Sequence, residues 1–216
     1  MRMLYGKSAK TGKNIYYIDD ELFKDGKQAN SIIVGKPGVG KTRNIRNKIK
    51  QIKCNSDTKV IVVAEHCDEW DKQFIDSKDT DLIIEYDTLE NEFLHYRNII
   101  ESFIDNYKEN NRIYIFFDID SLDKNSYTYK FLEELYRKAR VNNCVITSTY
   151  RVYALIPYGI IHNTSILEIY TLREFKCYID AYEKIVDIID YNKASYIKKG
   201  YKVLIIDGHK IELEDI

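Results

Sequence analysis

A glycine-rich loop, GKPGVGKT, constrains this chain more than any other feature of its sequence. The loop runs from Gly35 to Thr42 and matches the pattern GxxxxGK[ST] at every fixed position. A short apolar run, residues 31–34, precedes the loop, and Ile45, Ile49 and Ile52 follow it at helical spacing. A strand that ends in such a loop and continues as an amphipathic helix is the context in which the pattern binds phosphate.

The fixed positions of this loop each have a chemical reason. Glycines allow backbone N–H groups to turn inward around a phosphate, where side chains would intrude. The following helix directs its positive N-terminal end at the same anion. We expect Lys41 to reach the β- and γ-phosphates and the Thr42 hydroxyl to bind Mg²⁺. The sequence therefore predicts a site for ATP and Mg²⁺ that is formed by Gly35, Pro37, Gly38, Val39, Gly40, Lys41, Thr42 and Arg43.

Apolar runs alternate with helical patterns along the rest of the chain. We expect strands at residues 31–34, 59–64, 82–86, 113–117 and 144–149, and helices at 40–53, 92–108 and 127–141. Apolar runs without alternation are typical of parallel strands that are covered on both faces. The pattern predicts an α/β fold of the P-loop NTPase (RecA-like) class, a mostly parallel sheet with helices on both faces. A small N-terminal hairpin is expected to turn at residues 11–13.

Length and composition limit the organisation of the chain. Its 216 residues, without a proline- or serine-rich linker, favour one domain over 1–216, with residues 1–30 as a hairpin extension. The net charge of -1 provides no overall attraction for nucleic acid, although local basic loops are compatible with it. No apolar run approaches the ~20 residues of a membrane span, so we expect no membrane segment. The dispersed cysteines favour buried, reduced thiols in a cytoplasmic protein: Cys54, Cys67, Cys144 and Cys177.

An acidic residue stands where a second part of the phosphate site is expected. Asp118 follows the apolar run 113–117, and we expect it to hold Mg²⁺ together with Thr42. The next residue is Ile119, which cannot polarise water, whereas many P-loop ATPases have a catalytic Glu there. Asp120 is the first candidate for that task, and Glu65, at the end of the run 59–64, is the second. Slow or absent hydrolysis is the remaining possibility.

Several further segments, taken together, resemble the motor domain of the FtsK/SpoIIIE DNA translocases, within the FtsK/HerA superfamily. They occur in the family's order and at nearly its spacing. The segments are LYGKSAKTGK at residues 4–13, YRKAR at 136–140, VITSTYR at 145–151, IIHN at 160–163 and GYKVLII at 200–206.

This resemblance implies a homo-oligomer, a hexameric ring, that uses ATP to move DNA through its centre. It implies that Thr149 senses the γ-phosphate and that an arginine reaches the ATP of a neighbouring subunit. Arg140 is the preferred arginine finger and Arg151 the alternative. Tyr150 stands where the family has Gln. Because the family's winged-helix domain and membrane anchor are missing, the resemblance suggests a motor from a mobile element. Such a motor would work in DNA transfer, packaging or segregation with a membrane-bound or capsid partner protein.

Two other functions remain open at this stage. Ile119 and Tyr150 favour a module that binds nucleotide to assemble or switch but hardly hydrolyses it. The phosphate loop alone is also compatible with a small-molecule kinase, although no Arg-rich lid segment is evident. The basic residues near the loop are interpreted as a solvated helix face: Lys36, Arg43, Arg46, Lys48, Lys50 and Lys53.

Overall fold

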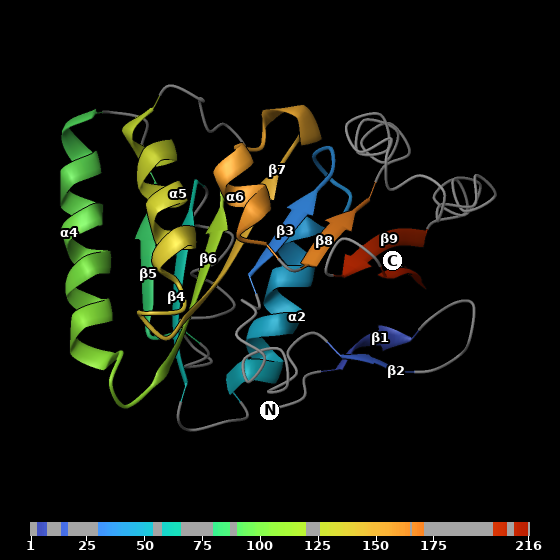
Figure 1. The fold of residues 1–216 in the computed structure, drawn as a ribbon, viewed down its shortest axis with the longest axis horizontal. Helices are drawn as coiled ribbons and strands as arrows, with labels where there is room; N and C mark the ends of the chain where they lie inside the picture. Colours follow the sequence, from blue (N-terminus) through green and yellow to red (C-terminus); the bar gives the residue numbers. More distant parts are fainter. Residues whose placement is uncertain are drawn as a thin grey trace.

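In the part of the chain that the structure describes, a sheet of eight strands forms the centre of the fold (Figure 1). The computed structural model describes residues 4–7, 14–16, 30–53, 58–65, 80–86, 90–119, 126–164, 166–170, 201–206 and 210–215. The strand order is β10-β9-β8-β3-β7-β6-β4-β5. The bounds are β3 Ser31–Val34, β4 Thr58–Ala64, β5 Leu82–Glu85, β6 Arg112–Asp118, β7 Cys144–Tyr150, β8 Ile166–Ile169, β9 Tyr201–Ile206 and β10 Lys210–Asp215.

The sheet is parallel from β8 to β5 and antiparallel only at β9 and β10. Outside this sheet, β1 (Leu4–Lys7) and β2 (Asn14–Tyr16) form a two-stranded antiparallel hairpin. The mostly parallel sheet and the N-terminal hairpin are therefore both confirmed.

Helices cover both faces of the sheet, as the sequence predicts (Figure 1). Helix α2 (Lys41–Lys53) packs on one face. Helices α4 (Glu90–Tyr107), α5 (Tyr127–Lys138) and α6 (Tyr158–His162) pack on the other, and a short 3₁₀ turn, η1 (Tyr153–Leu155), precedes α6. This arrangement is the α/β fold class that the alternation of patterns predicts.

Strand β6 shows why the sequence contains continuous apolar runs. Ile113, Ile115 and Phe117 point into the core beneath α4 and α5, whereas Tyr114 and Phe116 point into the core beneath α2. Successive side chains of a strand face opposite sides, so a strand with two covered faces must be apolar throughout.

Helix α5 ends earlier than predicted. The periodicity predicts a helix to residue 141, but regular helix stops at Lys138 and residues 139–143 form turns. Asn143 adopts the left-handed conformation with φ 52°, which asparagine tolerates better than most residues. The Cys144 N–H then donates to the Ala139 carbonyl at 2.8 Å and starts β7. Four short elements, β8, β10, η1 and α6, are not among the elements expected from the sequence.

The parallel strands bring their carboxyl ends to one edge of the sheet. Val34, Asp118 and Tyr150 end β3, β6 and β7, which are near neighbours in the sheet. Ligands bind at this edge in open α/β sheets. The phosphate loop leaves β3 at the same edge.

Candidate functional site

The loop between β3 and α2 has the backbone geometry that a phosphate cradle requires. Gly38 and Gly40 adopt φ values of 80° and 96°, which residues with a side chain rarely adopt. A Cβ added at Gly35 would lie 2.9 Å from Tyr170 Cβ and 2.9 Å from Val39 Cγ2. Glycine at position 35 is therefore required by close packing, and at 38 and 40 by backbone conformation.

Lys41 is held across the loop. Its side chain is buried, and Nζ donates to the Gly35 carbonyl at 2.8 Å and to the Lys36 carbonyl at 3.3 Å. A buried ammonium group at a helix N-terminus creates a strongly positive site. The arrangement suits an anion that accepts from the loop N–H groups and from Lys41.

Asp118 joins the loop to the neighbouring strands. Thr42 Oγ1 donates to Asp118 Oδ2 at 2.7 Å, and Thr149 Oγ1 donates to Asp118 Oδ1 at 3.4 Å. The Gly35 N–H also donates to the Tyr150 carbonyl at 2.9 Å, so the loop begins where β7 ends. The structure thus brings Lys41, Thr42, Asp118 and Thr149 together.

The residues that follow Asp118 and β4 bear on hydrolysis. Ile119 is buried in the core beneath α4 and α5, so it contributes nothing polar to the site. Asp120 lies outside the described residues. Glu65 lies beside Asp118, because Ala64 pairs with Asp118 and the Glu65 N–H donates to the Asp118 carbonyl at 3.4 Å. Of the two candidate bases, the structure describes only Glu65, at the edge where the loop lies.

The two candidate arginines lie at opposite ends of the strands, Arg140 near the amino ends and Arg151 near the carboxyl ends. Arg140 follows the C-terminus of α5, close to the start of β7, so it lies at the edge away from the phosphate loop. Arg151 follows the end of β7 at the same edge as the loop. Both are exposed, as is Arg43. Arg140 is therefore far from the phosphate loop of its own chain.

The Tyr150 side chain lies in the core and not at the phosphate loop. It packs beneath α5, on the face of β7 opposite to the Thr149 side chain. Burial raises the pKa of Tyr150, so its phenol stays protonated near neutral pH and cannot act as a base. The carbonyl of Tyr150 contacts the loop, and this contact does not depend on the side chain.

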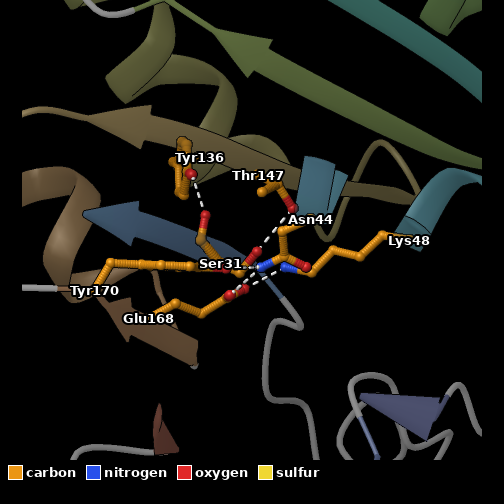
Figure 2. Close-up of polar contacts among 7 residues, drawn as sticks. All are labelled: Ser31, Asn44, Lys48, Tyr136, Thr147, Glu168 and Tyr170. Carbon is orange, nitrogen blue, oxygen red and sulfur yellow. Dashed lines mark hydrogen bonds and ion pairs between the residues drawn. The ribbon is translucent and has the colours of Figure 1, made fainter. Parts of the chain in front are cut away.

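A buried polar cluster beside the loop was missed by the sequence analysis (Figure 2). Glu168 of β8 is fully buried, and its Oε1 accepts from Lys48 of α2. Glu168 Oε2 accepts from the Asn44 side chain, which also donates to Tyr170 Oη at 2.6 Å. The interpretation of Lys48 as part of a solvated face is wrong, because Lys48 is buried and paired. A charged residue inside the apolar run 166–170 was the available signal.

Thr42 and Asp118 are suited to Mg²⁺, which prefers hard oxygen ligands. A hydroxyl and a carboxylate oxygen lie within 2.7 Å of each other next to the cradle, so one small cation could be served by both. Among the residues that the structure describes, no group of three or more His, Cys, Asp or Glu side chains could hold a metal. The oxygen pair at the loop is therefore the candidate metal position in this part of the chain.

No protein-family model and no curated protein matches the chain. Solved structures do match it. The DNA-packaging ATPase B204 from Sulfolobus turreted icosahedral virus superposes with a TM-score of 0.62 at 14% identity, over 86% of this chain and 97% of that one. The chain therefore shares the fold of this packaging ATPase. The resemblance found in the sequence is confirmed at the level of the fold.

Two further structures share this fold. VirB4 of Thermoanaerobacter pseudethanolicus matches with a TM-score of 0.66 at 11% identity, over 99% of this chain and 96% of that one. The genome packaging NTPase B204 from Sulfolobus turreted icosahedral virus 2, in complex with AMPPCP, matches with a TM-score of 0.61 at 13% identity, over 87% and 97% of the two chains. Within the described residues, no helix has both the length and the apolar character to cross a bilayer.

Proposed function

We propose that this protein is an ATPase that couples ATP hydrolysis to the movement of DNA. The observation that carries the proposal is the phosphate loop closed onto Asp118 through Thr42, at the carboxyl edge of a parallel sheet. The same fold occurs in a DNA-packaging ATPase, which supports the proposal. A structure of a genome packaging NTPase with AMPPCP supports a nucleotide as the ligand.

ATP would bind with its phosphates in the cradle between Gly35 and Thr42. Lys41 would exchange its bonds to the loop carbonyls for bonds to the phosphates, which compensates its buried charge. Thr42 and Asp118 would hold Mg²⁺, which neutralises the charge that develops during phosphoryl transfer. Thr149, bonded to Asp118, would report the presence of the γ-phosphate to β7.

A carboxylate must orient the attacking water, because Ile119 cannot. We propose Asp120 for this task, with Glu65 as the second candidate because its backbone is bonded to Asp118. The two are separated by comparing Asp120→Asn with Glu65→Gln. The variant that lacks the true base should lose ATP turnover but still bind ATP, whereas the other variant should keep its turnover.

The DNA-moving assembly would be a homo-oligomer, a hexameric ring in our proposal. The position of Arg140 at the edge away from its own loop supports a role in trans. Stabilisation of the transferring phosphoryl group by an arginine from a neighbour contributes a factor of about 10³–10⁵ in P-loop NTPases. Mixing Arg140→Ala with Lys41→Ala subunits tests this role. Each variant alone is inactive, and a mixture that regains activity shows that one copy completes the site of the next.

The test of the proposed function is ATP hydrolysis by the wild type and Lys41→Ala, with and without linear duplex or single-stranded DNA. A rate that rises with DNA and is lost in Lys41→Ala supports the motor. Lys50→Ala is the matched control, because Lys50 is an exposed lysine on the same helix. A rate that does not change over a DNA titration contradicts the coupling to DNA.

The burial of Ile119 favours a second function, a nucleotide-dependent assembly module with little hydrolysis. Such a module would change its oligomeric state with ATP and without turnover. Size-exclusion chromatography with light scattering, with and without ATP, tests it. An oligomeric state that is unaffected by ATP contradicts it.

A further inference from the structure

Four polar side chains from two segments meet beside the phosphate loop (Figure 2). Asn44 and Lys48 lie one turn apart on the same face of α2, and Glu168 and Tyr170 lie two residues apart at the end of β8. Both oxygens of Glu168 are engaged, one by Lys48 Nζ and the other by Asn44 Nδ2. Asn44 Nδ2 also donates to Tyr170 Oη at 2.6 Å.

This cluster is polar although it is buried. Glu168 is 0% exposed and Lys48 is 5% exposed. A buried ion pair is a poor source of stability, since well-packed apolar side chains of similar volume are often as good or better. A hydrogen-bonded ion pair adds geometric specificity, because its partners must contact each other through defined atoms. The cluster therefore fixes the position of α2 along β8 more strictly than apolar contacts would.

The same cluster contacts both ends of the phosphate loop. At the beginning of the loop, the Tyr170 N–H donates to the Val34 carbonyl at 2.9 Å, and Tyr170 Cβ lies where a side chain on Gly35 would. At the end of the loop, Asn44 lies in the first turn of α2, and its N–H donates to the Gly40 carbonyl at 2.9 Å. The main chains of Tyr170 and Asn44 thus bond to the two ends of the loop, and the side chains of these two residues bond to each other.

We propose that Glu168, Lys48, Asn44 and Tyr170 are positioning residues for the phosphate loop. They hold the Gly35 and Gly40 ends of the loop at the spacing that lets the loop N–H groups and Lys41 bind the phosphates of a nucleoside triphosphate. The inference rests on the proposed function, because it takes the loop to be the nucleotide site. Positioning of this kind lowers the cost of ordering the loop on binding.

The test is the affinity of a fluorescent ATP analogue, mant-ATP with Mg²⁺, for Lys48→Met/Glu168→Gln. This double variant removes both charges together, so no uncompensated buried charge remains. We expect the Kd to rise about tenfold or more, since small displacements of positioned groups have large effects. The melting temperature should stay close to that of the wild type, which separates positioning from loss of fold.

The matched control is Lys53→Met/Asp81→Asn. Lys53, at the end of α2 away from the loop, forms an ion pair of 2.6 Å with Asp81, which precedes β5. The control should bind mant-ATP as the wild type does. A folded Lys48→Met/Glu168→Gln protein that binds mant-ATP as tightly as this control overturns the inference.

Tyr170→Phe provides an independent variant if the double variant fails to fold. It removes only the hydroxyl that accepts from Asn44 and keeps the ring packed on Gly35. A raised Kd with an unchanged melting temperature supports the inference, and an unchanged Kd overturns it. The proposed function fails if the wild type itself does not bind mant-ATP. The inference alone fails if the wild type binds mant-ATP and the variants bind it equally tightly.

Discussion

Thr42 and Asp118 are joined by a hydrogen bond of 2.7 Å from Thr42 Oγ1 to Asp118 Oδ2. The two residues are 76 positions apart in the sequence, and they meet because β3 and β6 both pair with β7. This bond connects the phosphate loop to the strand that carries the candidate Mg²⁺ ligand.

Asp118→Asn is expected to reduce ATP hydrolysis by about 100-fold, the scale of losing one strong electrostatic contact to the transition state. The amide keeps the shape of the side chain but loses the charge that attracts Mg²⁺. Turnover and mant-ATP affinity measured over a Mg²⁺ titration check this prediction. Asp105→Asn, at an exposed carboxylate on α4, is the control. Hydrolysis by Asp118→Asn with an unchanged Mg²⁺ dependence would contradict a role in metal binding.

Gly35→Ala and Gly159→Ala form a matched pair of substitutions. In each case an added Cβ would lie closer than 3.0 Å to a neighbour, but the neighbours differ. At Gly35 they are Tyr170 Cβ and Val39 Cγ2, which are packed, and at Gly159 the neighbour is the carboxylate of the half-buried Glu133. We expect Gly35→Ala to lower the free energy of unfolding by about 1–3 kcal/mol. Gly159→Ala, within α6, should be neutral or stabilising by up to about 1 kcal/mol.

Urea unfolding of both alanine variants measures this difference. Gly35→Ala should also weaken the binding of mant-ATP, whereas Gly159→Ala should not. Equal destabilisation by the two substitutions would contradict the distinction between packed and mobile neighbours.

Asp81 is expected to make stability depend on pH. Partial burial alone would raise the pKa of Asp81, but hydrogen bonds from Lys53 and the Val60 N–H, and the charges of Lys53 and Lys59, lower it overall. A lowered folded-state pKa stabilises the fold above the ordinary carboxyl pKa of about 4, and this stabilisation is lost as pH falls below it. Asp81→Asn should therefore cost less than about 1 kcal/mol at pH 7, since the pair is partly exposed.

Urea unfolding at neutral and acidic pH checks this prediction. The difference between wild type and Asp81→Asn should shrink as the pH approaches the lowered pKa and passes it. A difference that stays constant with pH would show that the charge of Asp81 is not responsible.

Cys144 is expected to resist alkylation in the folded protein. Burial raises the pKa of its thiol to about 12, although the positive charge of Lys108 acts in the opposite direction. The thiol is also inaccessible, because Cys144 is 3% exposed. The thiolate is the reactive form, so iodoacetamide should modify Cys144 only after unfolding. Peptide mass spectrometry with and without guanidinium chloride measures this, and equal labelling in both states would contradict it.

The phosphate loop and the sheet could be predicted because their signals are local. Gly35–Thr42 carries its chemistry in consecutive residues, and strands such as β6 are apolar throughout because both faces are covered. Asp118 was recognisable for the same reason, as the first carboxylate after such a run.

The Glu168 cluster could not be predicted, because its partners come from distant segments. Lys48 and Glu168 are 120 residues apart, and nothing in the neighbourhood of Lys48 distinguishes it from the exposed Lys50. The short strand β8 gives too few residues for a clear period.

The place of β3 in the strand order has a consequence for biosynthesis. Strand β3 pairs with β7 and β8, and Thr147 follows Ser31 by 116 residues. At about 5–20 residues per second, the ribosome needs roughly 6–23 s to reach β7 after it completes β3. During that time the phosphate loop has neither of its neighbouring strands. We therefore expect that a chain that stops before β8 does not retain nucleotide.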